Sequence, residues 1–200
     1  MKRLLLVRHG ESEWNAVRRL QGQADIGLSE KGVAQARELG PTIAQLAPDL
    51  VVTSDLRRAR HTAELLGYPE ARHEPGLREV DVGEWTGQEI ATITANDPEA
   101  YRGWRAGSFA PPGGENWMDF CARTVHATKE AAKEADRLLV VCHGGVIRAL
   151  LQSLLDLSPK RIIPVGPASL TILANKPGES VMRLEVFNFS PGGPVLDAPD

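Results

Sequence analysis

Four apolar residues, Leu4-Leu5-Leu6-Val7, are followed at once by the polar cluster Arg8-His9-Gly10-Glu11-Ser12. A short apolar run that stops so abruptly predicts a fully buried strand with polar residues at its carboxyl end. The same pattern recurs at Leu138–Cys142, which is followed by His143-Gly144-Gly145. In open α/β sheets, ligands bind at the carboxyl ends of the strands. The two repeats therefore predict that His9 and His143 share one pocket, where glycines let the backbone approach a ligand.

The residues around these two strands predict one α/β domain with a central, mostly parallel sheet. Ser29 is a candidate N-cap for a helix that Pro48 ends, a second strand spans 50–53, and a helix covers about 55–66. The other predicted elements are helices over 88–96, 116–135 and 146–155, strands over 171–174 and 182–186 that pair around Pro177-Gly178, and a loop over 111–114.

Composition bounds the kind of protein. The chain has 200 residues, of which 42% are hydrophobic and 24% charged, close to the average of globular proteins. The apolar content excludes intrinsic disorder, and a net charge of −3 disfavours a dedicated nucleic-acid binder. The apolar runs are too short for a membrane span or a signal peptide, so we expect a cytoplasmic location. Cys121 and Cys142 are expected to be two reduced thiols.

The residue types at the strand ends indicate phosphate chemistry. Arg8 precedes His9, and the strand over 50–53 leads into Ser54-Asp55-Leu56-Arg57-Arg58, which brings arginines to the same edge. An arginine fork matches phosphate oxygens, and a histidine can accept a phosphoryl group as a nucleophile. A proton donor for the leaving oxygen is also needed. The stretch after Leu77 offers Glu79, Asp81 and Glu84, and periodicity alone does not choose among them.

The order of these blocks resembles that of a known family. Arg8-His9-Gly10, Ser54–Ala59, Leu77-Arg78-Glu79 and Cys142–Gly145 are similar, in sequence and order, to the motifs of the histidine phosphatase superfamily, phosphoglycerate mutase-like branch. The resemblance implies a single three-layer αβα domain over 1–190. It also implies a short cap that selects the substrate, over about 80–135, and we expect a mobile tail over 191–200.

The resemblance also implies roles for individual residues. His9 would become phosphohistidine, with its other ring nitrogen donating to a backbone carbonyl, and Glu79 would act as general acid and then as base. The groups implied to bind the phosphate are Arg8, Arg57, protonated His143, Asn15, Gln21, Gly22 and the N–H of Gly144. No metal or cofactor is expected.

The remaining candidates receive structural interpretations. Arg58 and Arg60 are expected to be surface charges or helix contacts, and His61, His73 and His126 structural residues. Trp14 and Trp85 could either shape the pocket mouth or pack, and Trp104 and Trp117 are expected to pack. Glu115 is expected at a helix start, with a place in the pocket as the alternative.

The function predicted from these features is a metal-independent phosphatase that hydrolyses small phosphomonoesters. One alternative is a cofactor-dependent phosphoglycerate mutase, and a second is a non-catalytic module that binds a phosphate ligand. Only 64 positions (143 − 79) separate Glu79 from His143, and this segment has no paired-arginine motif, which favours hydrolysis. The expected partner is a small phosphorylated metabolite, with no nucleic acid or membrane. A homodimer fits the sequence, although no exposed apolar helix indicates one.

Overall fold

A six-stranded sheet forms the centre of the molecule. The computed structural model describes residues 1–176, 181–193 and 198, and its strands are ordered β3-β2-β4-β1-β5-β6. The strands are β1 (Arg3–Arg8), β2 (Leu50–Thr53), β3 (Arg72–His73), β4 (Arg137–Cys142), β5 (Leu170–Asn175) and β6 (Met182–Phe189). The pairs β3–β2, β2–β4 and β4–β1 are parallel, and β1–β5 and β5–β6 are antiparallel. The prediction of a mostly parallel sheet is therefore confirmed.

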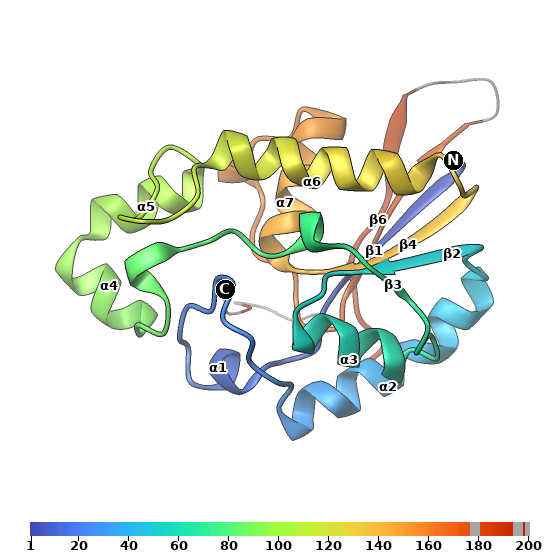
Figure 1. Cartoon of the computed structure of the whole chain (residues 1–200), viewed down its shortest axis with the longest axis horizontal. Helices are drawn as coiled ribbons and strands as arrows, with labels where there is room; N and C mark the ends of the chain where they lie inside the picture. The colour runs from blue at the N-terminus through green and yellow to red at the C-terminus, as the bar shows by residue number, and fades with distance from the viewer. Residues whose placement is uncertain (177–180, 194–197, 199–200) are drawn as a thin grey trace.

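Helices cover both faces of this sheet (Figure 1). Helices α2 (Glu30–Leu46) and α3 (Arg57–Leu65) pack on one face, and α6 (Trp117–Ala132) and α7 (Gly144–Leu155) pack on the other. Alternate strand residues point to opposite faces, so Leu4 and Leu6 of β1 join the α6/α7 core while Leu5 and Val7 join the α2/α3 core. This burial on both faces explains the uninterrupted apolar run.

Most element boundaries lie close to the predicted ones. The Ser29 hydroxyl caps α2 by accepting from the Gly32 N–H, and Asn116 caps α6 in the same way. The predicted antiparallel pair is present as β5 and β6, but its proposed turn at Pro177-Gly178 lies outside the described residues. Most of the predicted mobile tail, 194–197 and 199–200, lies outside them too.

The segment between β3 and α6 contains one helix, α5, that we did not predict from the sequence. After the 3₁₀ turns η1 (Pro75–Leu77) and η2 (Gly83–Trp85) come α4 (Ile90–Asn96) and α5 (Pro98–Ala106). Helix α5 has an Asp97 N-cap, Pro98 in its first turn and a left-handed Gly107 at its C-cap. Its inner face contributes Tyr101 and Trp104 to an aromatic cluster with Trp85 and Phe109. We call residues 83–109 the cap segment.

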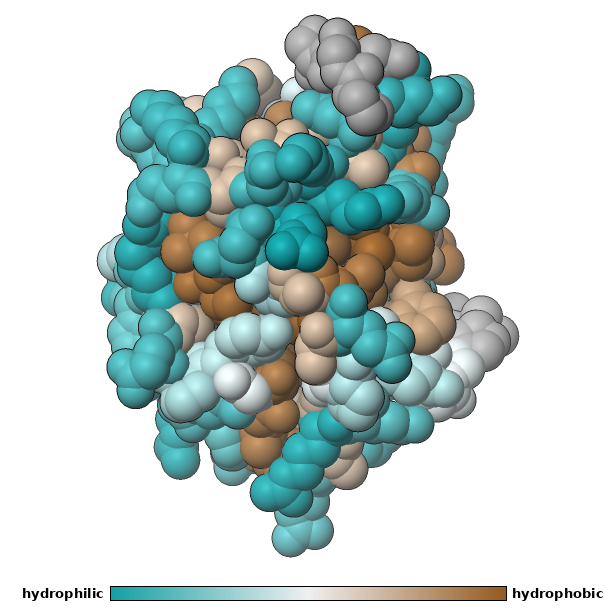
Figure 2. All heavy atoms as spheres, turned by 90° about the vertical axis from the view of Figure 1, so that its right-hand side faces the viewer, coloured by the Kyte–Doolittle hydropathy of each residue, from teal (hydrophilic) through white to brown (hydrophobic). Residues whose placement is uncertain are grey.

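The remaining short elements are α1 (Glu13–Ala16) and the 3₁₀ turn η3 (Pro159–Arg161). The amino ends of the strands carry exposed ion pairs, among them Lys2–Asp136 and Arg3–Glu185. Hydrophilic side chains surround apolar ones on the face in Figure 2, which is the right-hand side of Figure 1. In the part of the chain that the structure describes, no helix is both long and apolar enough to cross a membrane.

Candidate active site

His9 directly follows β1 and lies at a pocket with only 3% of its surface exposed. Its Nδ1 is 2.7 Å from the carbonyl oxygen of Gly10, so Nδ1–H donates to that carbonyl. This bond leaves Nε2 with its lone pair, and the Nε of Arg58 donates to it at 3.3 Å. Burial first, then the charges of Arg58 and Arg8, hold the pKa of His9 well below its usual value. His9 is therefore a neutral imidazole whose Nε2 carries the lone pair that a nucleophile needs.

Arg58, and not Arg57, lies beside this histidine. Arg58 is 1% exposed and donates from Nη1 to the carbonyl of Ala24 and from Nη2 to that of Gly22. The predicted residue, Arg57, is exposed, and its backbone N–H donates to the Asp25 carboxylate. Successive helix residues point roughly 100° apart, so only one of the two can face the sheet edge. The placement of Arg57 in the pocket was wrong, as was the interpretation of Arg58 as a surface charge or simple helix contact.

A signal in the sequence favours Arg58. The buried face of α3 includes the small residues Ala59 and Thr62, and Thr62 stands four residues after Arg58, on the same face. In the structure the Thr62 hydroxyl donates to the Arg58 carbonyl and accepts from the Gly10 N–H. The helix period thus indicates which of the two adjacent arginines is buried.

Arg8 is the last residue of β1, and His143 directly follows the neighbouring parallel strand β4. Arg8 pairs in register with Cys142, is 2% exposed, and donates from Nη1 to the Val165 carbonyl at 2.5 Å. Burial lowers the pKa of Arg8 to about 10, while the charge of Glu79 acts in the opposite direction. Arg8 therefore stays cationic at neutral pH.

The His143 side chain is fully buried, with its ring centroid 5.1 Å from that of His9. Its Nε2 is 2.8 Å from the Ser54 hydroxyl. Burial, followed by the charge of Arg58, holds the pKa of His143 well below its usual value. The expectation that His143 is protonated therefore does not fit the free protein, where its ring is neutral and the charge at this edge comes from Arg8 and Arg58.

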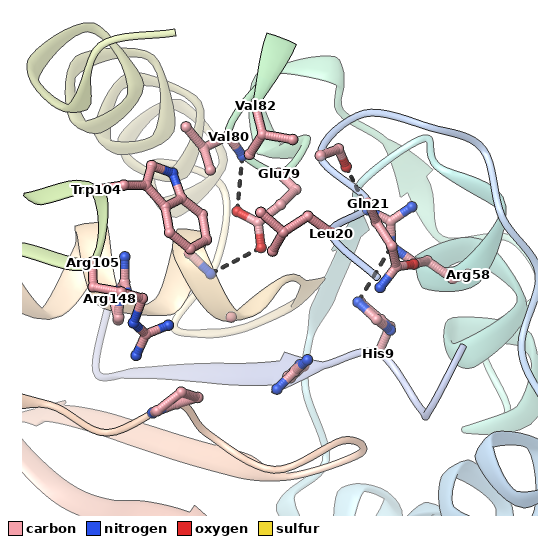
Figure 3. Close-up of a pocket in the computed structure, with 15 residues that line it drawn as sticks. His9, Leu20, Gln21, Arg58, Glu79, Val80, Val82, Trp104, Arg105 and Arg148 are labelled. Carbon is pink, nitrogen blue, oxygen red and sulfur yellow. Dashed lines mark hydrogen bonds between the residues drawn. The ribbon is translucent and has the colours of Figure 1, made fainter. Parts of the chain in front are cut away.

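Glu79 is the one of the three carboxylate candidates that lines the pocket. Its carboxylate accepts from the N–H of Val80 at 2.8 Å and from the N–H of Gly145 at 3.0 Å (Figure 3). The Asp81 carboxylate instead accepts from the Gly83 N–H within its own turn. A Cβ at Gly145 would come within 2.1 Å of the Glu79 carboxylate, so glycine at this position lets Glu79 take its observed place.

A second arginine that the sequence did not single out holds the backbone of Glu79 in place. Arg123 of α6 donates to the carbonyls of Gly76, Arg78 and Glu79 at 3.0, 2.8 and 3.0 Å. Its guanidinium also forms a two-bonded ion pair with Glu115, at 2.6 and 2.7 Å. Glu115, expected at a helix start, thus orients an arginine that fixes the Glu79 loop.

The other predicted phosphate contacts divide into two groups. Gln21, Gly22 and Gly144 line the pocket. Asn15 does not; it is buried in the capping box of α1, where its side chain accepts from Ser12. The Ser12 hydroxyl also lies 2.8 Å from the Gln21 side chain, so Asn15 is linked to the pocket through Ser12.

The far side of the pocket is lined by the cap and its neighbours. Trp104 and Arg105 of the cap segment, Arg148 of α7, and the apolar Leu20, Val80 and Val82 surround it (Figure 3). Trp104 was expected only to pack, and it both packs and lines the pocket. Trp85 packs within the aromatic cluster, and Trp117 packs in the core.

Comparisons with known proteins agree with this geometry. A model of the histidine phosphatase superfamily (branch 1) matches residues 4–188. Glucosyl-3-phosphoglycerate phosphatase of Mycobacterium tuberculosis (strain H37Rv) is 39% identical, over 94% of this chain and 95% of that protein. Metal-independent phosphoserine phosphatase of Arabidopsis thaliana is 36% identical over 74% of this chain and 66% of the relative. A probable phosphoglycerate mutase of Salmonella newport is 34% identical over 78% of this chain and 76% of the relative.

Solved structures give the same result. The structure of a mycobacterial glucosyl-3-phosphoglycerate phosphatase in complex with VO₃ superposes with a TM-score of 0.85 and 38% identity, covering 95% of this chain and all of that one. This chain belongs to the histidine phosphatase superfamily. The predicted family, fold class and enzyme class, a histidine phosphatase, are therefore confirmed.

Proposed function

We propose that the protein hydrolyses small phosphomonoesters without a metal ion, in two steps through a phosphohistidine on His9. The observation that carries the proposal is the neutral His9 ring, with Nδ1–H bound to the Gly10 carbonyl and Nε2 facing a pocket that Arg58 and Glu79 also line. The name of the plant relative, a metal-independent phosphoserine phosphatase, supports the absence of a metal requirement.

In the first step, the Nε2 lone pair of His9 would form a bond to phosphorus as the bond from phosphorus to the ester oxygen breaks. The transition state of phosphoryl transfer is loose, so the protein acts mainly by positioning and by charge. Arg8 and Arg58 would bind the phosphoryl oxygens, and the pocket-lining Gly144, in the first turn of α7, adds the favourable helix N-terminus. Glu79, as the general acid, would give a proton to the leaving alkoxide.

In the second step, water would attack the phosphohistidine while Glu79, now ionised, accepts a proton from that water. The bond from phosphorus to Nε2 then breaks, which releases inorganic phosphate and restores neutral His9. The neutral His143 would share the phosphate site by hydrogen bonding, oriented by Ser54. The balance of protons is closed because Glu79 donates one and recovers one.

The test is a discontinuous assay of p-nitrophenyl phosphate and a panel of phosphometabolites in the presence of EDTA, with the wild type beside His9→Ala and Glu79→Gln. We expect EDTA-resistant activity, abolition by His9→Ala, and a loss of about 10²–10⁴-fold by Glu79→Gln on the alkyl phosphates of the panel. Rapid quenching with ³²P-labelled substrate should trap an acid-labile, base-stable phosphoprotein in the wild type. Full activity of His9→Ala, or activity lost with EDTA, would contradict the proposal.

The names of the relatives suggest which panel members matter most. Glucosyl-3-phosphoglycerate, phosphoserine and phosphoglycerate appear in those names, and we propose them as first substrates. A mutase reaction is separated from hydrolysis by following 3-phosphoglycerate by NMR, because a mutase yields an isomer and a phosphatase yields free phosphate and glycerate. The cytoplasmic location and the homodimer stay predictions.

A further inference from the structure

The pocket has a second cationic end, away from the nucleophile. Arg105 of the cap segment and Arg148 of α7 both line it. In Figure 3 these two arginines lie together on one side of Glu79, and His9 and Arg58 lie on the other side. The positive charges therefore form two groups with the Glu79 carboxylate between them.

Arg148 is a buried charge without an ionic partner in the protein. Only 4% of the residue is exposed, and its guanidinium lies over the Trp117 ring, 5.2 Å from the ring centroid. Within residues 1–176, 181–193 and 198, no hydrogen bond or ion pair reaches it, and its Nε is buried without a partner. Burial lowers the pKa of Arg148 to about 10, the charge of Arg105 lowers it further, and that of Glu79 opposes both. Arg148 is thus still cationic at neutral pH.

Arg123 shows what a structural arginine looks like in the same protein. It too lies over an aromatic ring, that of Phe120, but Glu115 and three carbonyls satisfy its guanidinium. Removing a cation from water without such partners is strongly unfavourable. At Arg148 an anion in the pocket would recover that cost, and Arg105 would contribute a second cationic group to it.

We infer that this end of the pocket is a subsite for a second anionic group of the substrate, either a carboxylate or a phosphate. The inference rests on the proposed function, and it narrows the substrate class to small phosphomonoesters that carry a further negative charge. The phosphoryl group would bind at Arg8 and Arg58, and the second anion at Arg148 and Arg105. The short carbon skeleton between them would contact the apolar wall of Leu20, Val80, Val82 and Trp104.

The test compares kcat/KM for two matched substrate pairs in the wild type, Arg148→Gln and Arg105→Gln. 3-Phosphoglycerate and glycerol 3-phosphate differ by a carboxylate, and fructose 1,6-bisphosphate and fructose 6-phosphate differ by a phosphate. We expect the wild type to prefer the doubly anionic member of at least one pair by about tenfold or more, and the responding pair identifies the anion. Arg148→Gln should lower kcat/KM for that member by about 10–100-fold, because a charged hydrogen bond is lost. The change in kcat/KM for the singly anionic member of the pair and for p-nitrophenyl phosphate should stay within about threefold.

The matched control is Arg102→Gln, an exposed arginine of the same helix as Arg105 that does not line this pocket. Arg102→Gln should leave the ratio of kcat/KM values within each substrate pair unchanged. Equal losses on both members of each pair, or no preference in the wild type, would overturn the inference and make Arg148 a structural residue. If circular dichroism and Tm show that Arg148→Gln does not fold, the inference is judged instead on Arg105→Gln, from its kcat/KM for the doubly anionic substrate relative to the singly anionic one. Failure of the wild type to hydrolyse any ester, p-nitrophenyl phosphate included, would refute the proposed function instead.

Discussion

The two ends of the pocket are built by different kinds of structure. At one end, β1, β4 and the start of α3 deliver Arg8, His9, His143 and Arg58, all 3% exposed or less. At the other end, the cap segment contributes Trp104 and Arg105 through a cluster of aromatic rings with centroids 5.7–6.4 Å apart. The first end is fixed by strand register and two apolar cores, and the second by side chains that pack on one another.

We expect this difference to separate catalysis from substrate selection. Strand register and close packing hold His9, the proposed nucleophile, and Arg8 and Arg58 with little freedom, so substitutions there should affect every substrate. The cap can vary its side chains without disturbing a strand, so changes there should alter which substrates are preferred. The predictions that follow test this division.

The largest effect is expected at the strand-end group, from Arg58→Gln. Arg58 donates to the nucleophilic nitrogen and is buried beside it, and loss of one such charge-stabilising donor costs about 10²–10³-fold in kcat. The loss should be similar for p-nitrophenyl phosphate and for larger esters. Steady-state kinetics on both measure it.

The control for this prediction is Arg57→Gln, the adjacent exposed arginine. We expect its kcat and KM to stay within about twofold of the wild type, as for most surface substitutions. If Arg57→Gln is the more damaging change, the assignment of Arg58 to the phosphate site is wrong.

These two arginines also mark how far the sequence predicts the structure. The buried strands, the paired histidines and the mostly parallel sheet follow from short apolar runs that end in polar residues, a strong local signal. The choice between the two arginines follows from the buried face of α3, which Arg58 shares with Ala59 and Thr62. The resemblance assigned the phosphate contact to Arg57, whereas the helix period favours Arg58.

The cap end was less predictable for a physical reason. Helix α5 carries charged residues such as Glu99, Arg102 and Arg105 among its nine, and only Ala100 and Trp104 are buried. Its stability comes from ring contacts with residues that lie outside it in sequence, which periodicity does not detect. Arg123 and Arg148 were missed because an arginine inside a helix is usually exposed. The burial of Arg148 and the contacts of Arg123 depend on the segments packed against their helices.

A smaller loss is expected from Gly145→Ala, which displaces the Glu79 carboxylate. The added Cβ would meet a flexible side chain, so Glu79 can move away and the fold is retained. We expect kcat to fall by about 10–100-fold, part of the contribution of a general acid, with Tm changed little. Kinetics and thermal unfolding measure the two effects.

The informative comparison is a substrate whose leaving group needs no proton. p-Nitrophenolate leaves as a stable anion, so Gly145→Ala should reduce hydrolysis of its ester less than that of an alkyl phosphate. Equal losses on both would mean that the substitution acts elsewhere than on Glu79.

A loss of about tenfold is expected from Arg123→Gln, since Arg123 positions the loop of Glu79 without reaching the pocket lining. As a positioning residue of the general acid, Arg123 should affect kcat more than KM, and its loss should reduce hydrolysis of an alkyl phosphate more than that of p-nitrophenyl phosphate. Arg123→Lys, which keeps the charge, should recover part of the loss. A fall in Tm with equal losses on both substrates would make its role structural only.

At the cap, Trp104→Leu should alter selection and leave the chemistry intact. Trp104 lines the pocket from α5, so we expect kcat/KM for larger phosphomonoesters to change by about 3–10-fold through KM, as for lost apolar contacts in a binding pocket. The kcat for p-nitrophenyl phosphate should stay near that of the wild type. A loss of kcat as large as that of Arg58→Gln would remove the distinction between the two ends.

The smallest effect is the dependence of the free energy of unfolding on acid pH. We expect His9 and His143 at the strand ends to contribute to it, whereas the cap segment, 83–109, contains no histidine. His9 and His143 have pKa values lowered well below the usual value by burial. Below pH 6.5 the unfolded chain binds protons that the folded protein does not, so stability is complete above that pH and falls as pH decreases. Each histidine contributes a slope of up to about 1.4 kcal/mol per pH unit, or roughly 3–6 °C in Tm.

Thermal unfolding from pH 7.5 to 5 should show a shallower slope for His9→Gln than for the wild type, whereas His126→Gln, an exposed histidine, should leave the slope unchanged. Identical slopes for the wild type and His9→Gln would mean that folding does not lower the pKa of His9, which would contradict the effect of burial on this ring.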